Sequence, residues 1–97
     1  MEYRHSLHGE IDVATAPQLR SDLKQAVDTE GANLLVDCTH LTFIDSSGIA
    51  VLLEANAALE AEGRHMLLLN VDGAPRLAFE TLGLTDLFRY DRDTTPS

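Results

Sequence analysis

Aromatic side chains are scarce in this chain of 97 residues, and tryptophan is absent. Only 5% of the residues are aromatic whereas 44% are hydrophobic, so a core has to be built from Leu, Ile, Val and Ala. The chain is long enough for one such core and too short for two. We therefore expect a single domain over residues 1–97, with residues 91–97 as a polar tail.

Basic residues are scarce as well. Seven Lys and Arg stand against sixteen Asp and Glu, which gives a formal net charge of -9. The basic residues are scattered along the chain, whereas binding to nucleic acid or to an anionic membrane requires clustered positive charge. Both are therefore excluded as expected partners. The acidity itself is compatible with simple solubility and with steering toward a basic partner protein.

Cysteine occurs once, as Cys38, so no internal disulfide can form. We expect Cys38 to be a small core residue rather than a nucleophile. The first residues carry charges instead of the apolar run of a signal peptide, and the longest apolar run, Ile49–Leu53, is too short to span a bilayer. These features predict a cytoplasmic protein.

Strand-like and helix-like segments alternate along the chain, which predicts an α/β fold with a mostly parallel sheet of about four strands and helices packed against it. Apolar runs place the strands over Tyr3 to Ile11, Leu34 to Val36, Met66 to Leu69 and Phe88 to Tyr90. Capping and breaking residues predict three helices. The first runs from Pro17, with Thr15 as N-cap, to just before Gly31; the second runs from Ser47 to just before Gly63, and the third from Pro75 to just before Gly83.

Two further expectations concern these elements. A loop is expected over His40 to Ser46, ahead of the second helix. Helical spacing predicts the following inward faces: Ile49, Leu52, Asn56 and Leu59, together with Ala50, Leu53 and Ala57, in the second helix, and Leu77, Ala78 and Leu82 in the third.

The segment from Phe43 to Ile49 has the most distinctive local sequence. It joins a strand to a helix, where an open α/β sheet usually carries its functional loop. Asp45 or Ser46 could simply cap the helix while Gly48 permits a tight turn. Alternatively, Ser47 is a phosphoacceptor, whose phosphate would lie near free N–H groups and the positive end of the helix dipole. Both interpretations stay open on spacing alone.

Residues for catalysis or metal binding are not grouped in the sequence. The serines lack the Gly-x-Ser-x-Gly pattern of one large hydrolase class, and no Gly-rich phosphate loop occurs. His5 and His8 would face opposite sides of a strand, and His40 is expected in a solvated loop. Asp12 and Asp45 have no evident acid partner. We expect no enzyme activity, no cofactor and no metal.

Three segments resemble the signatures of the STAS-domain family. They are Gly9 to Pro17, then Leu35 to Asp37 with Leu41 to Ile49, and more weakly Leu82 to Leu84 with Phe88. The resemblance extends over roughly Gly9 to Tyr90, which is most of the chain. The run Asp-Ser-Ser-Gly, with its flanking strand and helix, is its most specific part.

The resemblance implies a bacterial anti-sigma factor antagonist. In that family the unphosphorylated antagonist captures an anti-sigma factor, which is also a serine kinase with a histidine-kinase-like ATPase fold, and thereby frees the sigma factor. Phosphorylation of the serine before the glycine, here Ser47, ends the capture, and a serine phosphatase restores it. The resemblance places the following residues on the partner-binding surface: Asp12, Thr15, Asp45, Ser46, Gly48 and Ile49.

The sequence departs from the family pattern at both ends. The family usually has a strand before the Gly9 segment and a final helix, whereas only Met1 to His8 and Asp91 to Ser97 are available for them. A missing strand would expose a sheet edge, so we expect a homodimer or a partner at that edge. Two other functions stay open: a STAS binding module without phosphoregulation, in a lipid-transport complex or a signalling scaffold, and a small hydrolase that uses Ser47.

Overall fold

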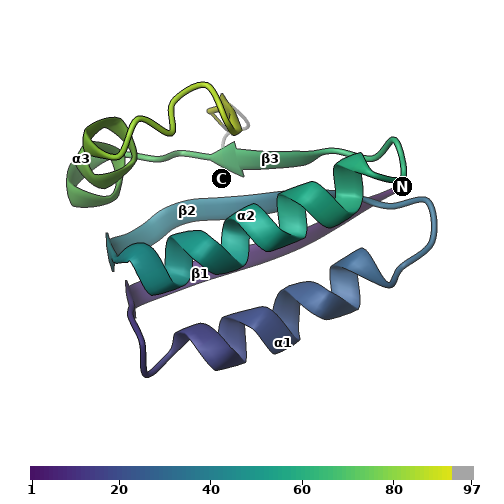
Figure 1. Ribbon diagram of the computed structural model, residues 1–97, viewed down its shortest axis with the longest axis horizontal. Coiled ribbons are helices and arrows are strands. Elements are labelled where there is room, and N and C mark those ends of the chain that lie inside the picture. Colours follow the sequence, from purple (N-terminus) through teal and green to yellow (C-terminus); the bar gives the residue numbers. More distant parts are fainter. Residues whose placement is uncertain (93–97) are drawn as a thin grey trace.

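Four parallel strands and three helices make up the computed structural model, which describes residues 1–92 (Figure 1). The strands are β1 (Glu2–Ile11), β2 (Asn33–Ile44), β3 (Met66–Leu69) and β4 (Arg89–Asp91), and the helices are α1 (Ala16–Val27), α2 (Ser46–Glu60) and α3 (Gly73–Thr81). The strands lie in the order β1-β2-β3-β4, and every neighbouring pair is parallel. The α/β prediction is confirmed.

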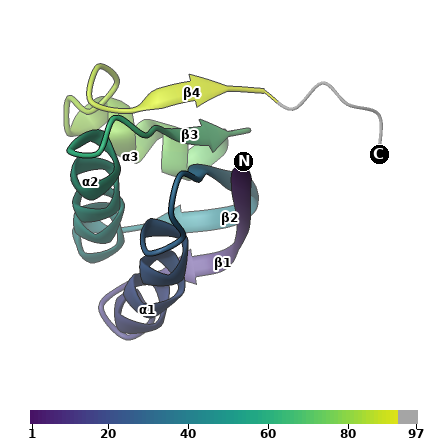
Figure 2. The same cartoon turned by 90° about the vertical axis from the view of Figure 1, so that its right-hand side faces the viewer.

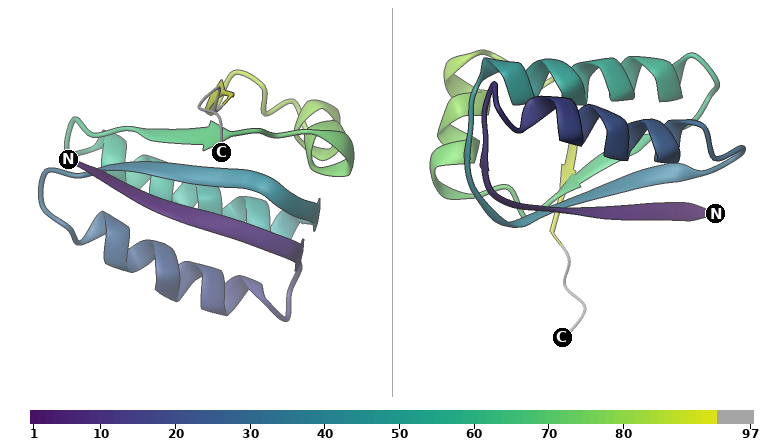
Figure 3. Two further views of the ribbon diagram at one scale, coloured as in Figure 1. Left: turned by 180° about the vertical axis from the view of Figure 1, so that it is seen from behind. Right: turned by 90° about the horizontal axis from the view of Figure 1, so that it is seen from below.

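Helices α1 and α2 lie side by side on one face of the sheet (Figure 2). The opposite face of β1 and β2 carries no helix within residues 1–92, as the right-hand view of Figure 3 shows. Along β1, Leu7 and Ile11 are buried on the helix side, while His8 and Glu10 are exposed. Successive side chains of a strand point to opposite faces, so the strand has one covered and one open side.

The core is aliphatic, as the composition requires, and α2 lies at its centre. Ile49, Leu52 and Leu59 are buried in it. Val51 and Ala55 are buried too and line the groove between α2 and α1. The helix is thus covered on two sides, but the second stripe was predicted wrongly: Ala50 and Ala57 are exposed, and Leu53 is half-buried.

Strand β2 is much longer than the sequence suggested, and the loop expected over His40 to Ser46 is wrong. The strand runs to Ile44 because β1 stays paired with it along its whole length, up to the partners Ile11 and Ile44. Strand β3 pairs only with the first part, Leu34 to Asp37. Beside the second part lies α3, which packs against β2 beyond the end of β3 (Figure 1).

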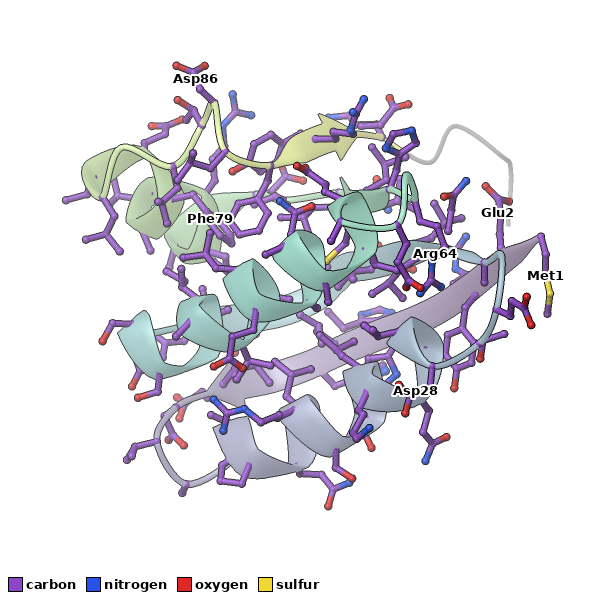
Figure 4. All side chains as sticks on the ribbon, turned by 45° about the vertical axis from the view of Figure 1, so that its right-hand side comes forward. Met1, Glu2, Asp28, Arg64, Phe79 and Asp86 are labelled. Carbon is purple, nitrogen blue, oxygen red and sulfur yellow. The ribbon has the colours of Figure 1, made fainter. Side chains whose placement is uncertain are left out.

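Helix α3 turns a different face inward than predicted. Leu77 and Leu82 are 63% and 54% exposed, whereas Phe79 is almost completely buried. The Phe79 ring meets Phe88 edge-on at a centroid distance of 5.5 Å, and Figure 4 shows it pointing from α3 into the molecule. An aromatic cluster therefore fills the space between α3 and the chain that leads into β4.

The first two residues of the predicted polar tail belong to the folded structure. Asp91 closes β4, and Arg92 forms an ion pair with Asp72. The rest of that predicted tail lies outside the described residues. Within residues 1–92, no helix has both the length and the hydropathy needed to cross a bilayer.

Candidate functional site

Two turns meet at the carboxyl ends of β1 and β2, which lie at the same end of the sheet (Figure 1). Ile11 and Ile44 are register partners, and the Asp45 N–H donates to the Ile11 carbonyl at 3.1 Å. The loop 12–15 and the turn 45–48 therefore lie next to each other. This is the edge at which open parallel sheets usually present their functional loops.

Asp45 is the N-cap of α2. Its carboxylate accepts hydrogen bonds from the N–H groups of Ser47 at 2.8 Å and Gly48 at 3.3 Å, while its backbone is extended. The capping role expected from the sequence is confirmed for Asp45. It also means that these two N–H groups are already bound to a carboxylate and are not free for a phosphate.

Asp12 organises the neighbouring loop in the same way. Its Oδ1 accepts from the N–H groups of Ala14 at 2.9 Å and Thr15 at 3.1 Å, and the Thr15 hydroxyl accepts from the Asp12 N–H at 2.8 Å. Thr15 occupies the N-cap position of α1, as predicted, but its side chain makes no capping bond. The hydroxyl is used within the loop instead, which fixes the loop's shape.

Gly48 has a different role from the tight turn expected. It is a helical residue without a positive φ. A Cβ added to it would lie 2.5 Å from Ile11 Cγ2 and 2.8 Å from Ile44 Cγ1. Glycine is needed here because the first turn of α2 lies directly on the ends of the two strands, which holds Ser47 close to the loop 12–15.

The exposed and half-buried residues of this end form what we call the switch surface: Asp12, Val13, Thr15, Asp45, Ser46 and Ser47. Ser46 and Thr15 are exposed, and Ser47 is half-buried. Ile49 is only 3% exposed and packs in the core, so it does not lie on this surface as expected. Val13, at 74% exposure, was missed, because a single exposed apolar residue is common on protein surfaces and does not mark a site in the sequence.

The switch surface carries carboxylates and hydroxyls, and basic groups are remote in the sequence. Residues 25–63 contain neither Lys nor Arg. The residues described hold no cluster of three or more His, Cys, Asp and Glu side chains suited to a metal ion. His40, the histidine closest to Ser47 in sequence, stacks on His8 at 5.3 Å between ring centroids. It is thus engaged with a partner on another strand.

Cys38 lies buried in the core, as predicted. Burial, and secondly the nearby charge of Asp37, raise the pKa of its thiol to about 12. Since the thiolate is the reactive form, the fold disfavours the reactive state of Cys38.

Comparison with known proteins places this geometry in a family. A family model described as the STAS domain matches residues 5–95. The anti-sigma-B factor antagonist of Listeria monocytogenes is 32% identical over 79 residues, which cover 81% of this chain and 69% of that protein. The Staphylococcus aureus protein of the same name is 26% identical over 92 residues, covering 95% and 85%.

Solved structures agree with the fold. The anti-sigma factor antagonist SpoIIAA in its unphosphorylated form superposes with a TM-score of 0.73 at 23% identity, over 97% of this chain and 81% of that one. The Bacillus cell fate determinant SpoIIAA in its phosphorylated form gives 0.74 at 26% identity, over 96% and 83%.

Proposed function

The chain belongs to the STAS domain family, and from that premise we propose that it is an anti-sigma factor antagonist. It binds an anti-sigma factor through the switch surface and thereby releases a sigma factor in the cytoplasm. The observation that carries the proposal is the Asp45-capped turn with Ser46 and Ser47 at its start, next to the fixed loop of Asp12. The chain acts by binding and not as an enzyme.

The proposed control is phosphorylation of Ser47 by the anti-sigma factor, a serine kinase with a histidine-kinase-like ATPase fold, and its reversal by a serine phosphatase. Ser47 is half-buried, but it lies in the first turn of α2 at the molecular surface. Only a small local movement of this turn is therefore needed to bring its hydroxyl to a kinase. Of the partner contacts expected from the sequence, Asp12, Thr15, Asp45 and Ser46 have the exposure that direct contact needs. Gly48 is buried and does not contact the partner directly. It contributes by allowing α2 to lie close to the strand ends, which positions Ser47.

The local charges favour a switch that works by repulsion and desolvation. A phosphate on Ser47 adds about -1.5 to -2 charge at neutral pH. The Asp45 carboxylate already occupies the N–H groups of Ser47 and Gly48, and no Lys or Arg occurs in residues 25–63. A phosphate on Ser47 therefore has neither the N–H groups of Ser47 and Gly48 nor a basic residue in the flanking sequence to hold it. Covering it with a partner protein would bury an uncompensated dianion.

The test compares binding and phosphorylation by the purified anti-sigma factor with ATP. Ser47→Ala is expected to keep binding and to lose phosphorylation, because it removes only the acceptor. Ser47→Asp is expected to weaken binding by at least about tenfold, measured by calorimetry. Ser46→Ala is the matched control and should still take up one phosphate. The intact mass of the protein isolated from its native cell, followed by peptide mapping, tests the same assignment independently.

Three results would change the proposal. If Ser47→Asp bound the anti-sigma factor as tightly as the unmodified protein, repulsion would not be the mechanism. If the chain stayed unmodified under every growth condition and co-purified with a constant partner, it would be a STAS binding module without phosphoregulation. Labelling of Ser47 by a serine-reactive hydrolase probe would favour the third alternative, a small hydrolase.

A further inference from the structure

Two histidines meet on the face of the sheet that carries no helix. His8 of β1 and His40 of β2 are register partners in the parallel pair. Their rings stack nearly parallel, with an interplanar angle of 8° and 5.3 Å between centroids. Both residues are exposed, and Leu7 and Leu41, their neighbours in sequence, are buried on the opposite face. The pair lies outside the switch surface and has no part in the proposed function.

The separation of the rings fits the chelation of one metal ion. With zinc–nitrogen bonds of about 2.0–2.1 Å, two imidazoles on one tetrahedral ion stand with their centroids about 5 Å apart. The observed 5.3 Å is close to that value, but in the stacked arrangement the lone pairs of the two rings lie in separate, nearly parallel planes. Both rings therefore have to turn about the terminal side-chain torsion, out of the stack, before their nitrogens can face one ion. Imidazole is a preferred ligand of zinc, copper and nickel.

We propose that His8 and His40 bind one divalent transition-metal ion, of the zinc, copper or nickel type, across β1 and β2. The described residues offer no third ligand at this place, so water fills the other positions. Along the same face the neighbouring register pairs are Ser6 with Asp37 and Glu10 with Phe43. The Asp37 carboxylate is held by Arg4 at 2.9 Å and by Thr39, so it stays with its own partners.

The net charge of -9 favours an ion of this kind at the surface. An ion held by both strands also favours the folded state, because the two ligands are far apart in the unfolded chain. Binding should therefore raise the melting temperature as well as release heat. An open site with two ligands implies reversible binding, weaker than that of a four-ligand structural zinc site.

Titration of the full chain with Cu²⁺ and Zn²⁺, after removal of any purification tag, tests the proposal at about pH 7.5, where most imidazoles are neutral. The expected result is one ion per chain. His8→Asn and His40→Asn should each lose at least about tenfold in affinity. His65→Asn and His5→Asn are matched controls and should bind as the unmodified chain does. Pulsed electron paramagnetic resonance of the Cu²⁺ complex should count two imidazoles.

The proposal is overturned if the unmodified chain shows no saturable binding up to about 1 mM ion. It is also overturned if a control variant loses as much affinity as His8→Asn, or if the copper spectrum shows a single imidazole. Circular dichroism melting curves of the metal-free variants, expected to match the unmodified chain because both rings are exposed, separate lost ligands from lost folding. Phosphorylation of Ser47 should be the same in His40→Asn, so the two proposals succeed or fail separately.

Discussion

At the scale of single residues, Gly48 is the position with the least room for change. Gly48→Ala places a Cβ within 2.5 Å of Ile11 and 2.8 Å of Ile44, both of them core side chains. The helix or the strand ends must shift, and such overpacking lowers the free energy of unfolding by about 1–3 kcal/mol. Denaturant unfolding of the variant and the unmodified chain measures this difference. Ala50→Ser, on the exposed side of α2, is the control and should stay within about 0.5 kcal/mol.

Asp37 should make the stability of the fold sensitive to acid. Its partial burial by itself raises the pKa of the carboxyl and is the largest single cause, but hydrogen bonds to the carboxylate, led by those from the Thr39 hydroxyl and N–H, together outweigh it. Further bonds from Arg4 and Asn70 add to them. The pKa of Asp37 is thereby lowered to about 2, compared with about 3.9 for an unfolded chain.

Because this pKa is lowered by folding, the contribution to stability is complete above about pH 4 and is lost as the pH falls from about 4 to about 2. Asp37→Asn is expected to lower the free energy of unfolding by about 1–2 kcal/mol at neutral pH. The difference from the unmodified chain should shrink across that acid range, as measured by urea unfolding at a series of pH values. A difference that stays constant down to pH 2 would contradict the ionised network.

At the scale of elements, Arg64 joins the end of α1 to the start of β2. Its guanidinium is buried and donates to the carbonyls of Thr29 at 2.8 Å, Ala32 at 3.0 Å and Val27. Figure 4 shows Arg64 at the end of the molecule where Asp28 closes α1. A lysine cannot donate in this planar arrangement.

Arg64→Lys should therefore cost about 2–4 kcal/mol of unfolding free energy, because buried carbonyls lose their donors. Arg76→Lys serves as the matched control, since Arg76 is exposed and pairs with Glu80 on its own helix. That control should change stability by less than about 0.5 kcal/mol. Equal effects of the two variants in thermal unfolding would show that Arg64 does not hold these elements together.

The elements also show which features of the fold can be predicted from the sequence. The alternation of strands and helices and the Asp45 cap were predictable, because they depend on local patterns and on one side-chain bond. The length of β2 was not, since Thr42 and Phe43 are exposed, and the segment stays extended because residues 41, 43 and 44 pair with β1. The inward face of α3 depends on the aromatic partners of Phe79, which lie later in the chain. The His8–His40 pair was missed because His40 was assigned to a loop.

At the scale of the whole molecule, the strand order leaves β1 at an edge. It spans 10 residues, contains no proline, and has no neighbour beyond it among the described residues. Long unprotected edges tend to pair with another strand. In an antiparallel pair of two copies centred on Leu7, Arg4 of each copy, which keeps its ion pair with Asp37 of its own chain, would lie opposite Glu10 of the other. This brings opposite charges near each other at two places. This complementarity favours a second copy as the occupant.

We therefore expect the chain to dimerise at high concentration, with a sheet that continues across a two-fold axis. Sedimentation equilibrium over a range of concentrations measures the association. Glu10→Arg puts like charges opposite each other at both ends of the pair and should weaken the dimer by about tenfold, since such contacts contribute about 1 kcal/mol each at most. Glu30→Arg makes the same change of charge outside β1 and should leave it unaltered. A monomer at every concentration would show that the edge is protected in another way. Equal weakening of the dimer by both variants would mean that net charge, and not strand pairing, governs the association.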